Sequence, residues 1–179
     1  MQGWRKTAAM LWAAAGLFIP AAARAEVLAA QPGGFEVRER AHVAAPPDKV
    51  WAALGRPAAW WSPDHTFSGD ARNLSLEVRA GGCLCERWSG GDVRHMSVVA
   101  VFTGSVLRLE GALGPLGGMG LQGHLTYALK PADGGTDLVV DYAVGGWSKE
   151  GLDQMAAPVD QVLGLLTTRL ARYAATGAP

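Results

Sequence analysis

A run of strand-length segments between residues 73 and 145, separated by glycine-rich turns, constrains the fold of this chain more than any other feature. Three pairs, Gly81-Gly82, Gly90-Gly91 and Gly104-Ser105, each suit the two central positions of a tight hairpin. Those positions require positive φ, which glycine adopts without strain. The run therefore predicts consecutive antiparallel strands.

The registers that these turns impose agree on one apolar face. They place Cys85 between Val78 and Met96, and Cys83 beside Val98, on neighbouring strands. A slip of one residue in any hairpin would mix this face with the charged one, so the pattern favours the predicted register.

The opposite face of the predicted sheet collects charged side chains. Glu86 and His95 are expected to lie opposite each other there, facing solvent. Arg87 and Arg94 are exceptions, because the same register turns them inward near the sheet margin. The inner face also holds Phe102, Leu125, Tyr127, Val140 and Tyr142.

Helical patterns flank this run on both sides. Residues 35–44 alternate as a first strand, with Glu39 on its inner side, and two short helical segments follow at 46–54 and 57–62. Residues 148–173 gather their apolar side chains in one arc, which predicts a long amphipathic helix with a bend at Pro158. Met155, Val159 and Leu163 belong to this arc.

These patterns together predict an α+β fold. Its sheet is curved, antiparallel and seven-stranded, and it wraps around the long C-terminal helix, with two short helices after the first strand. Residues 26–34 are expected to form a linker, residues 35–174 the domain and residues 175–179 a tail.

The first 25 residues have the layout of a cleavable secretory signal. Arg5 and Lys6 precede an apolar run, and small residues lead to a cleavage site expected between Ala25 and Glu26. This predicts a periplasmic protein, and the alternative is a retained interfacial helix. No later segment offers about 20 uninterrupted apolar residues, so the mature chain is not expected to insert into a membrane.

The charge balance argues against nucleic acid as a partner. Residues 1–25 contain three basic residues and no acid, so the remainder has 13 basic and 16 acidic residues. A mature chain with a small negative charge lacks the basic surface that nucleic-acid binding requires.

The order of elements, together with APPDKVWAAL, VRAGGCLCERW and GGTDLVVDYAVGG, resembles the START-like superfamily, also called SRPBCC or the Bet v 1-like helix-grip fold. Within it the chain is most similar to the branch named after the activator of Hsp90 ATPase homologue. The resemblance covers about residues 35 to 174. The chaperone role in the branch name is discounted, because Hsp90 is not expected outside the cytoplasm.

The resemblance implies a cavity between helix and sheet that receives a hydrophobic ligand. The principal hypothesis is an exported protein that binds a small apolar molecule, acting as a monomer or weak dimer and without a cofactor. The alternatives are a cyclase-like or hydrolase-like enzyme that uses the same cavity, and a non-catalytic domain that acts through its surface. The residues expected to line the cavity are Val78, Cys83, Cys85, Arg87, Met96, Val98, Leu125, Tyr127, Val140, Tyr142, Met155, Val159 and Leu163.

The two cysteines admit three interpretations: a soft-metal site with Met96, a redox pair, or a wall of small side chains. On a regular strand Cys83 and Cys85 lie about 6.6 Å apart, at the limit for a disulfide. A thioredoxin-type site needs two intervening residues and a helix N-terminus. The wall is therefore favoured, with no metal site.

The sequence contains few candidate catalytic groups. Glu39 and Tyr127 are the inward-facing candidates for proton transfer, although Glu39 is more simply expected to pair with an arginine.

The four histidines are expected to be solvated. The glycine-rich segment 111–120 lacks phosphate-binding spacing and is expected to form a lip of the cavity. Trp51, Trp60, Trp61 and Phe67 suit either a gate or the core.

Overall fold

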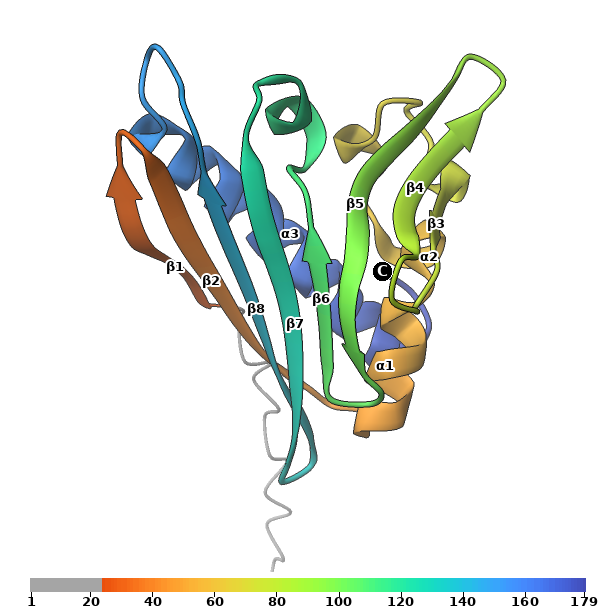
Figure 1. Cartoon of the computed structure of the whole chain (residues 1–179). Coiled ribbons are helices and arrows are strands. Elements are labelled where there is room, and N and C mark those ends of the chain that lie inside the picture. Colours follow the sequence, from red (N-terminus) through yellow and green to blue (C-terminus); the bar gives the residue numbers. More distant parts are fainter. Residues whose placement is uncertain (1–23) are drawn as a thin grey trace, which may run out of the picture.

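The computed structural model describes residues 24–179 and shows one antiparallel sheet with a long helix against one face (Figure 1). The sheet has eight strands in the order β1-β2-β8-β7-β6-β5-β4-β3. They are β1 (Arg24–Gln31), β2 (Gly34–Val43), β3 (Leu74–Leu76), β4 (Cys83–Trp88), β5 (Gly91–Phe102), β6 (Val106–Glu110), β7 (Gln122–Ala132) and β8 (Gly135–Gly145).

The helices lie at the start, the middle and the end of the domain. They are α1 (Pro47–Leu54), α2 (Pro57–Trp60), η1 (Pro63–His65), η2 (Ala71–Asn73), η3 (Gly114–Gly118), η4 (Asp153–Met155) and α3 (Ala156–Thr176), where η marks a 3-10 helix. The fold class is therefore the predicted α+β helix-grip arrangement. None of the helices in residues 24–179 combines the length and the apolar character needed to cross a bilayer.

Strand β1 is the element that the sequence did not predict. Residues 26–34 were expected to be a linker, but Arg24–Gln31 pairs with β2 and makes the sheet eight-stranded instead of seven-stranded. The strand is paired with β2 through its backbone, and the side chains of residues 26–31 are all exposed. Because neither face of the strand is buried, its sequence shows no alternation of apolar and polar residues that would predict a strand. The predicted cleavage site falls inside β1, and residues 1–23 lie outside the described part.

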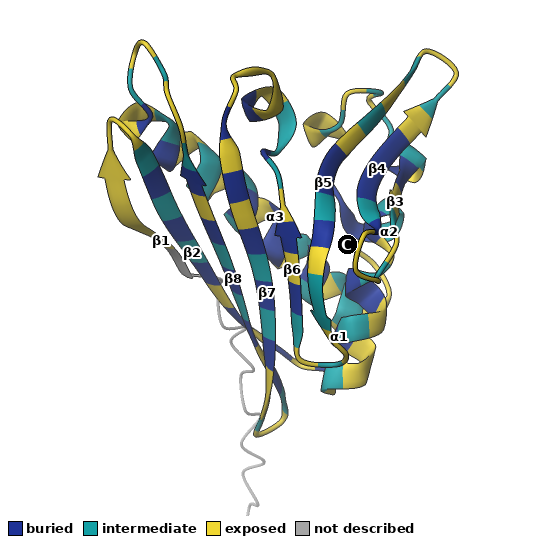
Figure 2. Cartoon of the chain, viewed as in Figure 1, coloured by how far each residue is buried: buried dark blue, intermediate teal, exposed yellow. Residues whose placement is uncertain are grey.

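The inner faces of β2, β7 and β8 follow the prediction. Leu125 is paired with Tyr142, and Tyr127 with Val140, and all four side chains are buried. Figure 2 shows buried and more exposed residues alternating along these strands. Helix α3 covers this face and buries Leu163, Leu166 and Leu170. Burial of both apolar surfaces is the main favourable contribution to folding.

The N-terminal end of α3 differs from the prediction. The helix begins at Ala156, preceded by a 3-10 turn, and Pro158 lies in its first turn. A proline is tolerated there because the first backbone N–H groups of a helix have no partner within the helix. The expected bend at Pro158 is therefore a helix start.

The predicted register of the hairpin between β4 and β5 is wrong by one or two residues. Trp88 is paired with Gly91, so Ser89-Gly90 forms the turn in place of Gly90-Gly91. A Cβ atom on Gly91 would lie 2.7 Å from the Trp88 ring, so this glycine makes room for the indole. Arg87 and Arg94 are consequently exposed, and Arg87 Nε donates to Asp92 Oδ2 at 3.0 Å.

The other two predicted turns are also corrected. Strand β3 ends at Leu76, and Gly82 lies in a longer loop where a Cβ atom would be 2.2 Å from the Glu77 carbonyl oxygen. Between β5 and β6, Phe102 is paired with Val106, so three residues form the turn and Phe102 is exposed. In both places glycine serves a turn or a close backbone approach that spacing alone does not distinguish.

Cys83 and Cys85, which the sequence favoured as small side chains in a cavity wall, form a disulfide. Their Cα atoms are 5.5 Å apart. This is shorter than the spacing of about 6.6 Å on a regular strand, so β4 is locally contracted between the two cysteines. The contraction permits a bond that regular strand geometry disfavours.

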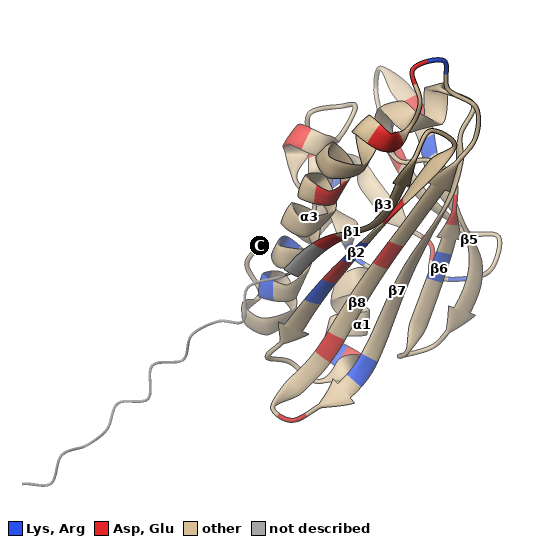
Figure 3. Cartoon of the chain, turned by 90° about the vertical axis from the view of Figure 1, so that its left-hand side faces the viewer, with Lys and Arg blue, Asp and Glu red and all other residues tan. Residues whose placement is uncertain are grey.

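Charged residues of both signs lie on the outer face of β2 and β8 (Figure 3). Arg38 Nε donates to Asp141 Oδ1, and His42 Nδ1 lies 3.0 Å from Asp137 Oδ1 across the same strand pair. Such cross-strand pairs add little stability each, but they keep this face solvated.

Glu39 is a buried acid without a counter-charge, not the predicted partner of an arginine. Its side chain is fully buried beneath α3, and a Cβ on Gly164 would lie 3.3 Å from Glu39 Oε2. Neither carboxyl oxygen has a hydrogen-bond partner among the described residues. Burial, together with the nearby charge of Asp160, raises the pKa of Glu39 to about 7.

This shift predicts a stability that falls as pH rises. The folded protein keeps the Glu39 proton up to about pH 7, whereas the unfolded chain releases it near pH 4.5. The stabilisation is therefore complete below pH 4.5 and is lost toward pH 7. At pH 8 we expect Glu39→Gln to raise the free energy of unfolding in urea by about 1–3 kcal/mol.

Glu36→Gln is the matched control, because Glu36 is on the outer face of the same strand. It should leave the pH dependence of the wild type unchanged. Equal pH dependence in the wild type and in Glu39→Gln would contradict the assignment.

The disulfide is expected to contribute only modestly to stability. Its sequence separation is 2, so it closes a very short loop and removes about 1–2 kcal/mol of unfolded-chain entropy. Reduction with a phosphine should lower the thermal midpoint by several degrees and leave the far-UV circular dichroism spectrum unchanged. Unfolding at room temperature on reduction would show that the fold depends on the bond.

Candidate functional site

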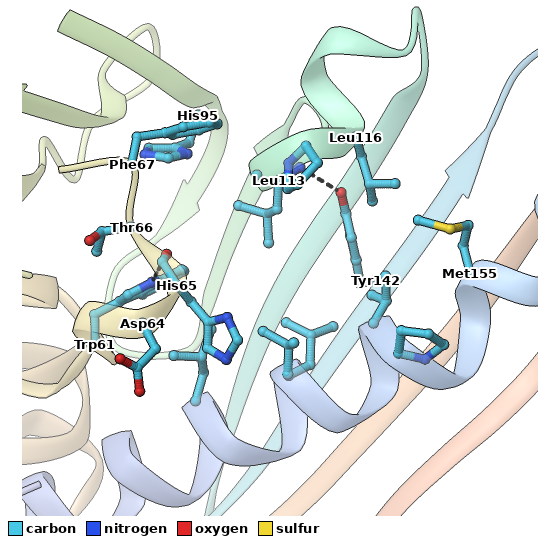
Figure 4. Close-up of a pocket in the computed structure, with 17 residues that line it drawn as sticks. Trp61, Asp64, His65, Thr66, Phe67, His95, Leu113, Leu116, Tyr142 and Met155 are labelled. Atoms are coloured by element: carbon cyan, nitrogen blue, oxygen red, sulfur yellow. Dashed lines mark hydrogen bonds between the residues drawn. The ribbon is translucent and has the colours of Figure 1, made fainter. Parts of the chain in front are cut away.

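A pocket of about 510 Å³ lies between α3, the segment that follows α2, the loop around η3 and the inner face of the sheet (Figure 4). This volume is within the range of small-molecule sites. The lining residues are Trp61, Asp64, His65, Thr66, Phe67, His95, Leu113, Gly114, Pro115, Leu116, Tyr142, Met155, Pro158, Val159, Val162, Leu163 and Leu166.

Most of the pocket wall is apolar. Helix α3 contributes Val159, Val162 and Leu163 from successive turns, and the η3 loop contributes Leu113 and Leu116. The 3.6-residue period of α3 brings its three side chains to one face, where Leu163 is buried and Val159 and Val162 are only partly covered. The wall therefore offers area burial as its main source of affinity.

Tyr142 places one polar group within this apolar surface. Its hydroxyl oxygen accepts a hydrogen bond from the Leu113 backbone N–H at 2.9 Å. Burial raises the pKa of Tyr142 to about 12, and the Leu113 hydrogen bond only partly offsets this effect. The phenol is therefore neutral at physiological pH, and its O–H remains free to donate.

The rim and the far end of the pocket carry the other polar groups. Asp64 and His65 are exposed on η1, and Thr66 and Phe67 follow them. The Phe67 ring stacks on His95, with centroids 5.6 Å apart and planes 25° apart. Figure 4 shows this stacked pair beside the rim residues.

A β-bulge directs His95 into the pocket. Leu84 is paired with Met96 and Cys85 with Arg94, so His95 is the extra residue of β5 and is left unpaired. As a result His95 and Met96 are both buried, although successive side chains of a regular strand point to opposite faces. Gly111, which has a φ of +142°, packs closely against this bulge. A Cβ atom on Gly111 would lie 2.8 Å from the His95 carbonyl oxygen.

The buried carboxylate of Glu86 anchors this end of the pocket. Its oxygens accept hydrogen bonds from the backbone N–H groups of Phe67 at 3.0 Å and Ser68 at 2.6 Å. His95 Nε2 lies 3.0 Å from Glu86 Oε2. Burial alone would raise the pKa of Glu86, but the hydrogen bonds from Ser68, Phe67 and His95 outweigh it and lower that pKa. Glu86 is therefore an ionised acceptor.

The structure brings four of the predicted cavity residues to the pocket: Tyr142, Met155, Val159 and Leu163. Five others are buried in the core away from it, namely Met96, Val98, Leu125, Tyr127 and Val140. Val78 is half-buried against the core, Cys83 and Cys85 form the disulfide, and Arg87 is exposed. The slipped register accounts for Arg87, whereas Leu125, Tyr127 and Val140 face inward as predicted and are absent from the lining of the pocket.

The two catalytic candidates do not line the pocket. Glu39 lies beneath α3, and Tyr127 is enclosed in the core, where burial raises the pKa of its phenol. Of the four aromatic residues considered as a gate, Trp61 and Phe67 line the pocket, while Trp60 is in the core and Trp51 packs against the core.

Two residues that matter at the pocket were assigned to the wrong face. Glu86 and His95 were expected to be outward and solvated, yet both are buried, whereas His42, His65 and His124 are exposed as predicted. The predicted register placed them opposite each other, whereas the structure pairs Glu86 with Val93 and leaves His95 in the bulge, from which its ring reaches Glu86. The sequence missed their direction because a bulge leaves no mark in the hydrophobic alternation.

No group of three or more His, Cys, Asp or Glu side chains within residues 24–179 is arranged to hold a metal ion. The two sulfur atoms expected to lie beside Met96 are joined to each other, so they do not form the soft-metal site that was considered. The glycine-rich segment contributes Leu113 to Leu116 to the pocket wall, as the expected lip would.

A family model described as polyketide cyclase / dehydrase and lipid transport matches residues 34–175. No curated protein matches the sequence. Among solved structures, protein MLL2253 from Mesorhizobium loti has a TM-score of 0.56 and 18% identity, covering 76% of this chain and 94% of that chain. CalU16 from Micromonospora echinospora has a TM-score of 0.57 and 17% identity, covering 88% and 86%.

DynU16, from the dynemicin biosynthetic locus, has a TM-score of 0.58 and 24% identity, covering 80% of this chain and 48% of that chain. At these identities the likeness shows a shared fold. The branch of the activator of Hsp90 ATPase homologue is not shown by these matches.

Glu86→Ala is expected to loosen the rim of the pocket. It removes the acceptor for two backbone N–H groups and one imidazole, so the free energy of unfolding should fall by about 2–4 kcal/mol. Hydrogen exchange at Phe67 and Ser68 should accelerate. Glu110→Ala, at an exposed position of β6, is the control and should change stability by less than about 0.5 kcal/mol. Unchanged exchange in Glu86→Ala would refute the anchoring role.

Proposed function

Because the chain belongs to the polyketide cyclase / dehydrase and lipid transport family, we propose that it is an exported protein that binds a small, mostly apolar molecule in the pocket against α3. The observation that carries this proposal is the pocket of about 510 Å³ with its largely apolar wall. Membership of the family supports a ligand-binding role but does not name the ligand.

The size and lining of the pocket support a ligand of one to three fused rings or a short acyl chain. Burying about 200 Å² of apolar ligand surface contributes about 5 kcal/mol before the cost of immobilising the ligand. On its own this contribution corresponds to a dissociation constant of about 0.2 mM, so binding that rests on this area is weak and reversible. The phenol of Tyr142 provides one fixed polar contact.

Two observations support the exported part of the proposal. Residues 1–25 have the composition of a secretory signal, and the Cys83–Cys85 disulfide is typical of proteins in oxidising compartments. The periplasm is such a compartment. A mature protein beginning at Glu26 would retain most of β1.

The alternatives are less well supported. A domain with a filled core does not account for the pocket, and the two predicted catalytic residues, Glu39 and Tyr127, do not line it. An enzyme of the cyclase or hydrolase kind would therefore need other groups. We favour non-covalent binding.

Filling the pocket tests this proposal. In Val159→Phe and Leu163→Phe the added ring occupies the space beside α3, so affinity for the neutral fluorophore N-phenyl-1-naphthylamine should fall at least about tenfold. Leu165→Phe, on the exposed side of the same helix, is the matched control and should bind as the wild type does.

Native mass spectrometry of protein from the periplasmic fraction should reveal a co-purifying ligand that is absent from Leu163→Phe. Wild-type affinity for the fluorophore in both pocket variants would place binding elsewhere and refute the assignment.

A further inference from the structure

The imidazole of His95 has an unused hydrogen-bonding position at the pocket. The residue is 9% exposed and lines the pocket. Nε2 faces Glu86, whereas Nδ1 has no hydrogen-bond partner among the described residues and is not among their fully enclosed polar atoms. A ligand in the pocket is therefore the natural partner for Nδ1.

The hydrogen-bond network determines which nitrogen carries the proton. Glu86 is ionised and accepts from the backbone N–H groups of Phe67 and Ser68, so it presents only acceptor oxygens to His95. Nε2 must then be the protonated nitrogen of the neutral ring. Nδ1 is left with a lone pair, which makes it a hydrogen-bond acceptor.

The packing fixes the ring in this orientation. The bulge in β5 turns His95 inward, the 3.0 Å contact with Glu86 holds Nε2, and the Phe67 ring covers one face of the imidazole. Exchanging the two nitrogens would break the Glu86 hydrogen bond. The acceptor therefore has a constant position relative to the pocket wall.

We propose that His95 Nδ1 is a specificity element that selects, among apolar molecules of suitable size, those with a neutral hydroxyl donor, such as a lipophilic alcohol, an enol or a phenol. The proposal rests on the proposed ligand-binding function. A ligand without a donor would strip water from Nδ1 and leave it unpaired, and an unpaired buried polar group is costly. Tyr142 supplies the opposite polarity, because its hydroxyl can donate.

Two probes that share a naphthalene ring and differ in the hydroxyl donor test the preference. 2-Naphthol has a hydroxyl donor, and 2-methoxynaphthalene replaces that hydrogen with a methyl group. We expect the wild type to bind 2-naphthol about tenfold more tightly, measured by isothermal titration calorimetry. In His95→Phe, which keeps a ring stacked beside Phe67, the ratio should fall to about one.

His124→Phe is the matched control, since His124 is exposed on β7 and should leave the tenfold ratio intact. Equal affinity of the two probes for the wild type would overturn the acceptor proposal and leave the apolar-ligand function standing. A preference that persists in His95→Phe would also overturn it. Failure of both probes to bind would instead refute the proposed function for ligands of this size.

The tautomer can be measured without any ligand. In 15N NMR spectra of the wild type, His95 should show protonated Nε2 and unprotonated Nδ1 at a pH where the ring is neutral. In Glu86→Ala the acceptor for Nε2–H is lost, so the ring is free to take either tautomer, and both the population of protonated Nε2 and the preference for 2-naphthol should fall.

A merely structural role for Glu86 would alter stability without moving the proton between the two nitrogens. Protonated Nδ1 in the neutral wild-type ring would overturn the proposal, whatever the probes show.

Discussion

The packing of α3 against the inner face of the sheet is the contact on which the rest of the structure depends. Where α3 meets β2, the contact is complete enough to bury even the carboxyl group of Glu39. On another side of the same turns of α3, Val159 and Val162 are only partly covered and form part of the pocket wall. A core that closed everywhere would be more stable, but it would have no space for a ligand.

One buried carboxylate organises the polar end of that space. Glu86 joins three parts of the chain that are separate in sequence: its own strand, the rim at Phe67 and Ser68, and the bulge at His95. Each hydrogen bond satisfies a group that would otherwise be costly to bury. The same arrangement assigns the imidazole proton, so the electrostatics of the rim determine what the pocket presents to a ligand.

The family and the structural relatives establish the fold, while the function is argued from the pocket. The description of the family includes both cyclases and lipid transport, and the fold alone does not decide between these activities. The proposed function depends on the apolar wall, on the neutral phenol of Tyr142 and on His95 Nδ1, which has no hydrogen-bond partner within residues 24–179. These are properties of single side chains in their tertiary setting.

The sequence by itself determined the helix-grip architecture, the inner faces of β2, β7 and β8, and the side of α3 that faces the sheet, because alternation and helical periodicity are local signals. Only the tertiary structure decided the registers of β3 to β6, the edge strand β1, the Cys83–Cys85 disulfide and the inward direction of Glu86 and His95. The physical reason is that a glycine pair can serve a turn, a bulge or a close contact with an indole. Which of these it serves depends on the strand that lies beside it.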